Sequence, residues 1–176
     1  MQKTPIRYLL DSDVLISAKN LHYNPKFCGV FWSWINEAHN AGNLFSVDKV
    51  KNELLSGGDK DVLYEWATRT NLNNFFLKTN QCAKQWGALS AWAHSPAKAF
   101  KELAKAKFLD IESADAWLIA YAAEHKDCVI VTNEVSAPFS KSSIKLPDAA
   151  AHLGVKTTTI FDLLCRHSGS NFIFSP

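Results

Sequence analysis

Acidic side chains next to apolar segments are the residues whose types and spacing suggest chemistry in this sequence. Asp11 and Asp13 interrupt the apolar run of residues 8–16, Asp115 opens a second apolar stretch, Glu53 precedes two leucines, and Glu134 follows the apolar segment 128–132. Carboxylates that cluster repel one another unless protons or cations neutralise them. Oxygen ligands without thiolates or paired imidazoles favour Mg²⁺ or Mn²⁺ over Zn²⁺. Such ions lower the pKa of a bound water and stabilise charge on a phosphate, so this set suits phosphodiester hydrolysis.

Strand-like and helical patterns alternate along the chain and decide where these carboxylates lie. The sequence predicts an α/β fold, a single domain with a central, mostly parallel sheet of four to five strands flanked by helices on both faces. Ligands in such sheets bind beyond the carboxyl ends of the strands, where Asp11 and Glu134 fall. We expect strands in the apolar run 8–16 and at 44–47, 75–77, 128–132 and 155–158, and helices near 31–41, 48–55 (with Asp48 as its cap), 62–67, 82–92, 100–104, 114–125, after Pro147 and 160–166.

Length and composition indicate one folded domain. The chain has 176 residues, of which 47% are hydrophobic and 20% charged, and a net charge of +2, which is too small to identify a nucleic-acid binder. The four cysteines form no C-x-x-C pair, and no apolar run reaches the roughly 20 residues of a membrane span. We therefore expect a cytoplasmic protein without a membrane segment. The predicted domain covers residues 1–167, with a helical insertion at about 57–109 and a C-terminal tail at 168–176.

Each carboxylate also has a purely structural explanation. Asp115 is favourable at the positive end of its helix, with Ser113 as the cap. Glu53 fits a solvated helix position, and Glu134 fits a surface turn. Asp11 argues most strongly for function, because a carboxylate between apolar residues is costly to bury without a partner.

Four motifs, in this order, resemble those of the PIN-domain nucleases. Residues 9–16 (LLDSDVLI) resemble the opening strand of that family, and residues 50–55 (VKNELL) its helix with a single Glu. Residues 114–120 (ADAWLIA) resemble the Asp that precedes a hydrophobic helix, and residues 129–134 (VIVTNE) the strand that ends in T-x-D, with Glu replacing Asp. Together with Tyr23-Asn24-Pro25, the aromatic segment 31–34 and Trp117, they resemble an uncharacterised PIN-like subfamily close to the VapC-type toxins.

The resemblance implies a Mg²⁺- or Mn²⁺-dependent endoribonuclease, the toxin of a toxin–antitoxin pair, that hydrolyses phosphodiester bonds with a metal-activated water. Its partners would be an RNA substrate, a cognate antitoxin protein and a second copy of the chain in a homodimer. Glu134 is one methylene longer than the usual Asp, which could displace a second metal. The implied catalytic and metal-binding residues are Asp11, Glu53, Asp115 and Glu134, with Asp11 and Asp115 as leading ligands, and the supporting residues are Ser12, Asp13, Glu112 and Asn133.

A row of lysines offers contacts for RNA phosphates. Lys98, Lys101 and Lys105 follow one another at spacings of three and four, which predicts one shared helix face. An ordinary solvated helix face explains the same spacing.

Two other functions fit parts of the sequence. Asp11-x-Asp13 also matches the nucleophile loop of haloacid-dehalogenase-type phosphatases, in which Asp11 would attack phosphorus and Asp13 would act as acid and base. That family also needs a late acidic pair, and the acids after residue 134, Asp148 and Asp162, stand apart. The third possibility is a non-catalytic PIN-like binding module.

Overall fold

The computed structural model describes residues 6–57, 60–69, 72 and 74–176. Helices and strands alternate along these ranges as the sequence predicts. In chain order they are β1 (Arg7–Leu10), α1 (Ser12–Ser17), the π-helix η1 (Ala18–His22), α2 (Gly29–Asn40), β2 (Leu44–Val47), α3 (Asp48–Leu55), α4 (Val62–Ala67), β3 (Phe76–Leu77), α5 (Ala83–Ala93), α6 (Glu102–Phe108), α7 (Ala114–Glu124), β4 (Cys128–Val131), α8 (Leu146–His152), β5 (Lys156–Thr158) and α9 (Ile160–His167).

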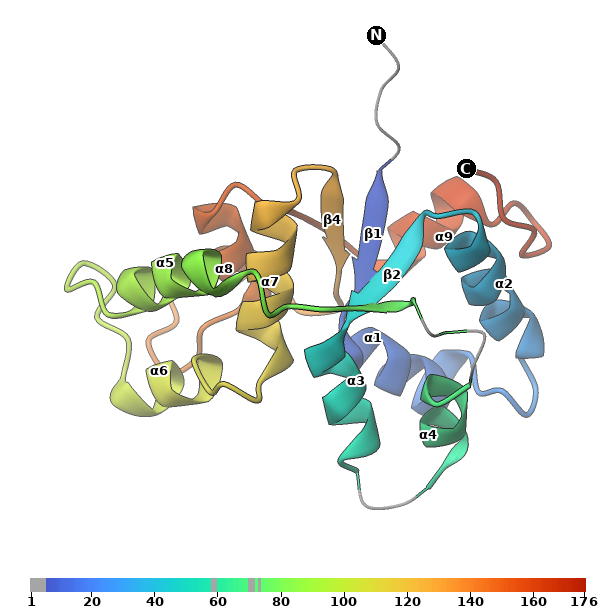
Figure 1. The fold of residues 1–176 in the computed structure, drawn as a ribbon, viewed down its shortest axis with the longest axis horizontal. Coiled ribbons are helices and arrows are strands. Elements are labelled where there is room, and N and C mark those ends of the chain that lie inside the picture. Colours follow the sequence, from blue (N-terminus) through green and yellow to red (C-terminus); the bar gives the residue numbers. More distant parts are fainter. Residues whose placement is uncertain (1–5, 58–59, 70–71, 73) are drawn as a thin grey trace, which may run out of the picture.

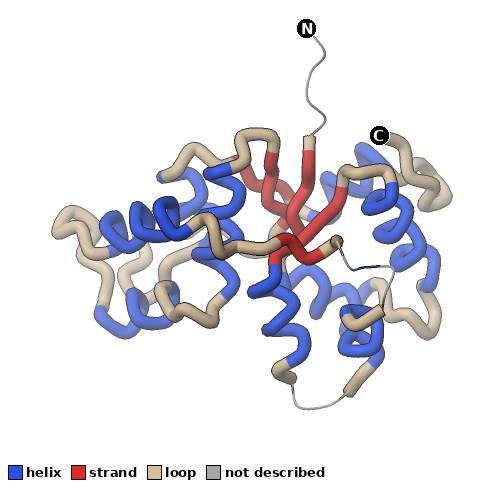
Figure 2. Tube along the Cα trace, viewed as in Figure 1, coloured by secondary structure: helices blue, strands red, loops and turns tan. Residues whose placement is uncertain are grey.

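The five strands form one parallel sheet in the order β3-β2-β1-β4-β5. The sheet lies at the centre of the molecule with helices around it (Figure 2). Leu9 and Leu10 of β1 are fully buried, as expected for a parallel strand that is covered on both faces. The predicted α/β fold with a parallel sheet is therefore confirmed.

Helices cover both faces of the sheet and gather below its carboxyl edge (Figure 1). Helices α5, α6, α7 and α8 lie on one side, and α7 packs against β2 and β4. Helices α2 and α9 lie on the other side, where the indole of Trp34 donates a hydrogen bond of 3.2 Å to the carbonyl of His167. Within the described part of the chain, no helix has the length and apolar character needed to cross a membrane.

The described residues of the predicted insertion, 57–109, contain a strand as well as helices. They supply the edge strand β3, which pairs with β2, and helix α5, which packs against α7. Trp86 of α5 stacks on Trp117 of α7 with ring centroids 5.6 Å apart.

The C-terminal segment folds back onto α9 and α2. The N–H of Ser175 donates a hydrogen bond of 2.8 Å to the carbonyl of His167, and the carbonyl of Ser175 lies 2.8 Å from Nδ1 of the same histidine. The ring of Phe174 lies 6.1 Å from that of Trp34. The segment predicted as a tail thus packs against its own domain.

Two local predictions are wrong. Val14, predicted to continue the first strand, lies in α1, because the side chain of Asp11 accepts a hydrogen bond from the Ser12 N–H and starts a helix there. Asp48 begins α3 but does not cap it, since its carboxylate accepts a hydrogen bond of 2.8 Å from the Thr79 hydroxyl instead.

Candidate active site

The centre of the sheet is the point at which the strand order reverses. From β1 the chain adds β2 and β3 on one side, and β4 and β5 lie on the other. Crevices at the carboxyl ends of the two strands that flank such a point are the usual ligand sites of α/β sheets. Asp11 directly follows β1 and Glu134 lies three residues after β4, so the predicted carboxylates reach this position from both strands.

Asp11 is held rigidly at the end of β1. Its carboxylate is 2% exposed, and it accepts hydrogen bonds from the Ser12 N–H at 2.7 Å and the Thr132 hydroxyl at 2.9 Å. Burial, and then the charges of Asp13 and Asp115, raise the pKa of Asp11 well above its usual range. Both donors are neutral, so neither of these contacts balances the negative charge of the buried carboxylate.

Asp13 extends the acidic region from the first turn of α1. Its carboxylate accepts hydrogen bonds from the backbone N–H of Asn133 at 3.2 and 3.4 Å. Burial raises the pKa of Asp13, and the charge of Glu134 adds to this, while a hydrogen bond with the Asp11 side chain and the bond from Asn133 oppose it.

Asp115 joins the same group from the first turn of α7. Burial raises its pKa to about 7, with further contributions from the charges of Glu134, Glu53 and Asp13. Lys107 opposes the shift. The structure therefore brings together five carboxylates, those of Asp11, Asp13, Glu53, Asp115 and Glu134, which we call the acidic site.

The two glutamates of the acidic site also cap helices. Glu53 of α3 accepts a hydrogen bond of 2.7 Å from the N–H of Ala114, the first residue of α7, where Ser113 makes no side-chain cap. Glu134 accepts one of 2.8 Å from the N–H of Leu146, the first residue of α8. Carboxylates are favourable at helix N-termini, so both residues position their helices as well as adding charge.

The supporting residues predicted from the sequence fall into two groups. Ser12 and Asn133 hold Asp11 and Asp13 through their backbone N–H groups. Glu112 instead forms an exposed ion pair of 3.3 Å with Lys49.

The predicted lysine row does not share a helix face. Helix α6 begins at Glu102, after a turn in which Ala99 adopts a φ of 50°, so Lys98 and Lys101 precede the helix. Lys105 lies within it and pairs with Glu102 at 2.7 Å. The spacing of three and four predicted a helix that includes all three lysines, but the helix begins only at Glu102, so the spacing alone was misleading.

The sequence analysis missed two functional contributions. Thr132 donates to Asp11, and its hydroxyl accepts a hydrogen bond of 3.1 Å from the N–H of Glu134, so it joins two members of the acidic site. Its place in the motif of residues 129–134 was a usable signal. Lys145 pairs with Glu134 at 3.2 Å from an irregular segment that offers no pattern.

A cavity of about 190 Å³ opens beside Asp115 and Glu134. Lys107 and Lys145 line the same cavity. Two ammonium groups next to two carboxylates create a place where an anionic group can approach the acidic site.

The chemistry of the acidic site fits a hard divalent cation. All five side chains offer carboxylate oxygens, and the pKa values of three of them are raised chiefly by burial and further by neighbouring carboxylates. Across the described residues, no three His, Cys, Asp or Glu side chains are placed to hold an ion together. Mg²⁺ usually keeps several waters and takes only one or two carboxylates from the protein, so a magnesium site does not require three protein ligands.

Comparison with protein families matches residues 8–172 to a family described as a domain of unknown function, DUF4411. No curated protein and no solved structure was found to match the chain. The matched segment contains the sheet except for Arg7, together with all five carboxylates of the acidic site, and the chain therefore belongs to the DUF4411 family.

Proposed function

We propose that this protein is a Mg²⁺- or Mn²⁺-dependent endoribonuclease of the PIN type that acts in the cytoplasm. The observation that carries the proposal is the convergence of five carboxylates at the switch point of a parallel sheet, where burial and mutual repulsion raise the pKa of Asp11, Asp13 and Asp115. The four motifs that resemble PIN nucleases supply these carboxylates.

The residues of the chain divide the work of the proposed reaction. Asp11, fixed by Thr132 and Ser12, and Asp115, fixed at the start of α7, would hold the cation. When bound, such an ion lowers the pKa of a coordinated water and offsets charge on the scissile phosphate. Lys107 and Lys145 line the adjacent cavity and would receive the RNA backbone there, Lys145 from its ion pair with Glu134.

The same geometry favours a nuclease over a phosphatase with Asp11 as its nucleophile. The late acids that a phosphatase would need are engaged elsewhere: Asp148 accepts a hydrogen bond from the Ala137 N–H, and Asp162 pairs with Thr159. The alternative to a nuclease is a non-catalytic binding module, and the cleavage experiment described below distinguishes the two.

The proposed assignment as the toxin of a toxin–antitoxin pair extends to its partners, a cognate antitoxin and a second copy of the chain. Both rest on the resemblance of the four motifs to the VapC-type toxins. Purification together with the product of a neighbouring gene, and inhibition of cleavage by that product, would test this part separately.

Cleavage of a labelled, mixed-sequence RNA pool tests the nuclease directly. We expect cutting by the purified protein with Mg²⁺ or Mn²⁺, none with EDTA, and none by Asp11→Asn or Asp115→Asn. Glu37→Gln removes a charge on the exposed side of α2 and is the matched control that should cut normally. Equal cutting by both Asp variants would overturn the proposed site, and no metal binding by calorimetry together with no cutting would favour the binding module.

A further inference from the structure

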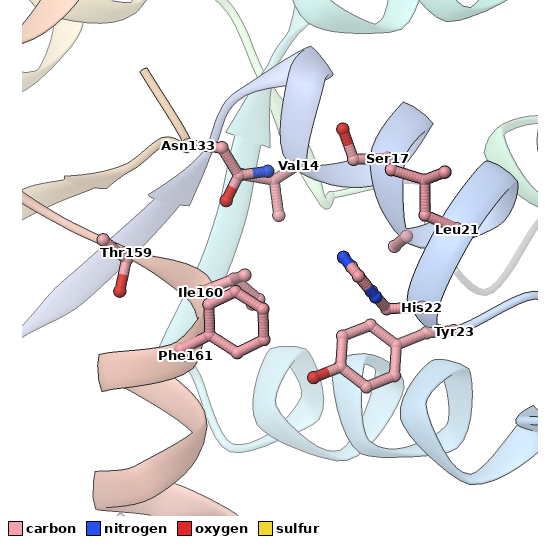
Figure 3. A pocket seen from close by; sticks show the side chains of 10 residues that line it. Val14, Ser17, Leu21, His22, Tyr23, Asn133, Thr159, Ile160 and Phe161 are labelled. Carbon is pink, nitrogen blue, oxygen red and sulfur yellow. The ribbon is translucent and has the colours of Figure 1, made fainter. Parts of the chain in front are cut away.

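A second and larger cavity lies next to the acidic site. Its volume is about 320 Å³, and its walls come from α1, the π-helix η1, the segment after β4 and the start of α9. The rings of His22, Tyr23 and Phe161 and the amide of Asn133 surround the hollow (Figure 3). Three stretches that are distant in sequence, within residues 14–23, at 133 and at 159–161, thus build one pocket.

The backbone connects this pocket directly to the acidic site. Asn133 lines the pocket with its side chain while its backbone N–H donates to the carboxylate of Asp13. Val14, the residue after Asp13, also lines the pocket. A ligand that binds to the acidic site through one of its groups can therefore place an adjacent group in the pocket.

The aromatic wall is rigid on one side and open on the other. Tyr23 stacks on Phe31 with ring centroids 4.3 Å apart, and Phe31 is fully buried. Phe161 is 52% exposed, and its ring meets that of His22 edge to face at 6.0 Å. An exposed phenylalanine beside a preformed hollow offers a free face on which a planar ring can stack.

The polar groups of the pocket suit a neutral heterocycle. Its described lining residues include no Asp, Glu, Lys or Arg, so the pocket has no charged partner for a phosphate. The amide of Asn133 offers one donor group and one acceptor, the pairing pattern by which Asn reads the edge of a base. The hydroxyl of Ser17 adds a further donor or acceptor.

We propose that this pocket binds the nucleobase of a nucleotide next to the scissile phosphate, a reading that rests on the proposed nuclease function. The base stacks on Phe161 beside His22, and its polar edge pairs with the Asn133 amide. Stacking accepts every base, because each has a π face, whereas the amide discriminates among their edges. The pocket thereby gives the enzyme a preference for one base beside the cut.

Nucleotide binding can be measured without any cleavage. The probes are the four ribonucleoside 5′-monophosphates in EDTA, followed by NMR signals of the His22 ring and the Asn133 side-chain amide. We expect shifts in both signals and a Kd for Phe161→Ala that is at least about fivefold weaker, as loss of one base–aromatic stack requires. Phe139→Ala, which truncates a 91% exposed phenylalanine outside the pocket, is the matched control and should bind normally.

Asn133→Ala retains the backbone N–H to Asp13 and should reduce the differences in affinity among the four nucleotides. An absence of shifts with all four nucleotides, or equal binding by Phe161→Ala, would overturn the proposal. A stronger response to N-acetyltryptophanamide, which represents an aromatic side chain of a protein, would assign the pocket to a protein partner instead.

The two proposals fail in different ways. Nucleotide binding at these residues without RNA cleavage would contradict the proposed nuclease function and support the proposed base pocket. Metal-dependent cleavage with the same base preference in the parent and in Phe161→Ala would contradict the pocket and leave the nuclease.

Discussion

Removing the charge of Asp115 should stabilise the folded protein above neutral pH. The pKa of Asp115 is about 7 in the folded protein, chiefly because of burial, against an ordinary value of 3.8. Below pH 3.8 the carboxyl is protonated in both the folded and the unfolded state, so it has no effect on stability. As the pH rises towards 7 the unfolded state releases its proton first, and the free energy of unfolding falls until both states are ionised.

The two pKa values set the size of the effect. At about 1.36 kcal/mol per pH unit, the difference between 3.8 and about 7 corresponds to at most about 4 kcal/mol. Asparagine also loses the attraction between a negative charge and the N-terminus of α7, which is worth about 0.3–1 kcal/mol. Asp115→Asn is therefore expected to be about 3 kcal/mol more stable than the parent at pH 8.

Urea unfolding followed by tryptophan fluorescence, from pH 5 to pH 8.5 in EDTA, measures this difference. The control is Asp127→Asn, whose carboxylate pairs with the Arg7 guanidinium at 2.7 Å and has a pKa lowered chiefly by that hydrogen bond. A lowered pKa stabilises the protein above the ordinary pKa and loses this effect as the pH falls through the folded value, so Asp127→Asn should destabilise it at pH 8.

At pH 8, Asp115→Asn should therefore raise the free energy of unfolding, and Asp127→Asn should lower it. If Asp115→Asn were no more stable than the parent at pH 8 while Asp127→Asn behaved as expected, then burial and the neighbouring carboxylates would not disfavour the charged form of Asp115, and the electrostatic account of the site would be wrong.

Three further perturbations test contacts around the site. Thr132→Val removes the hydroxyl that bonds to Asp11 and to the Glu134 N–H, and should lower the free energy of unfolding by about 1–3 kcal/mol, measured in urea. Glu53→Ala removes the cap of α7 and should cost about 0.5–2 kcal/mol, whereas Glu53→Gln keeps an acceptor for the Ala114 N–H and should lose less; equal losses would contradict the capping role. Phe174→Ala removes a ring that packs against Trp34 and His167, and should make the C-terminal segment a faster target for limited proteolysis than in the parent.

Apolar periodicity predicted the parallel sheet, because strands buried on both faces are continuous hydrophobic runs. Residues 44–47 and 128–131 form strands as expected. The same rule failed at Val14, Leu15 and Ile16, since an apolar run of three residues fits a strand and a buried helix turn equally well. The Asp11 side chain, which accepts from the Ser12 N–H, decided in favour of the helix.

The motifs located the carboxylates of the acidic site but not the contacts that hold them. Thr132 and Asp11 are 121 residues apart in sequence and meet only because β1 and β4 are neighbours in the sheet. The pairing of Lys145 with Glu134 depends on a loop that has no periodic pattern. Contacts of this kind follow from the strand order, which the hydrophobic pattern alone does not specify.

The glutamates explain how so many carboxylates can share one edge of the sheet. Glu53 and Glu134 each accept a hydrogen bond from the first N–H of a helix, so they tie α7 and α8 to the acidic site. The pKa values of Asp11, Asp13 and Asp115 are raised by burial and by the charges of neighbouring carboxylates. A cation that binds there would recover the stability that the cluster costs, which is why metal affinity and the pH dependence of unfolding should change together in every variant of the acidic site.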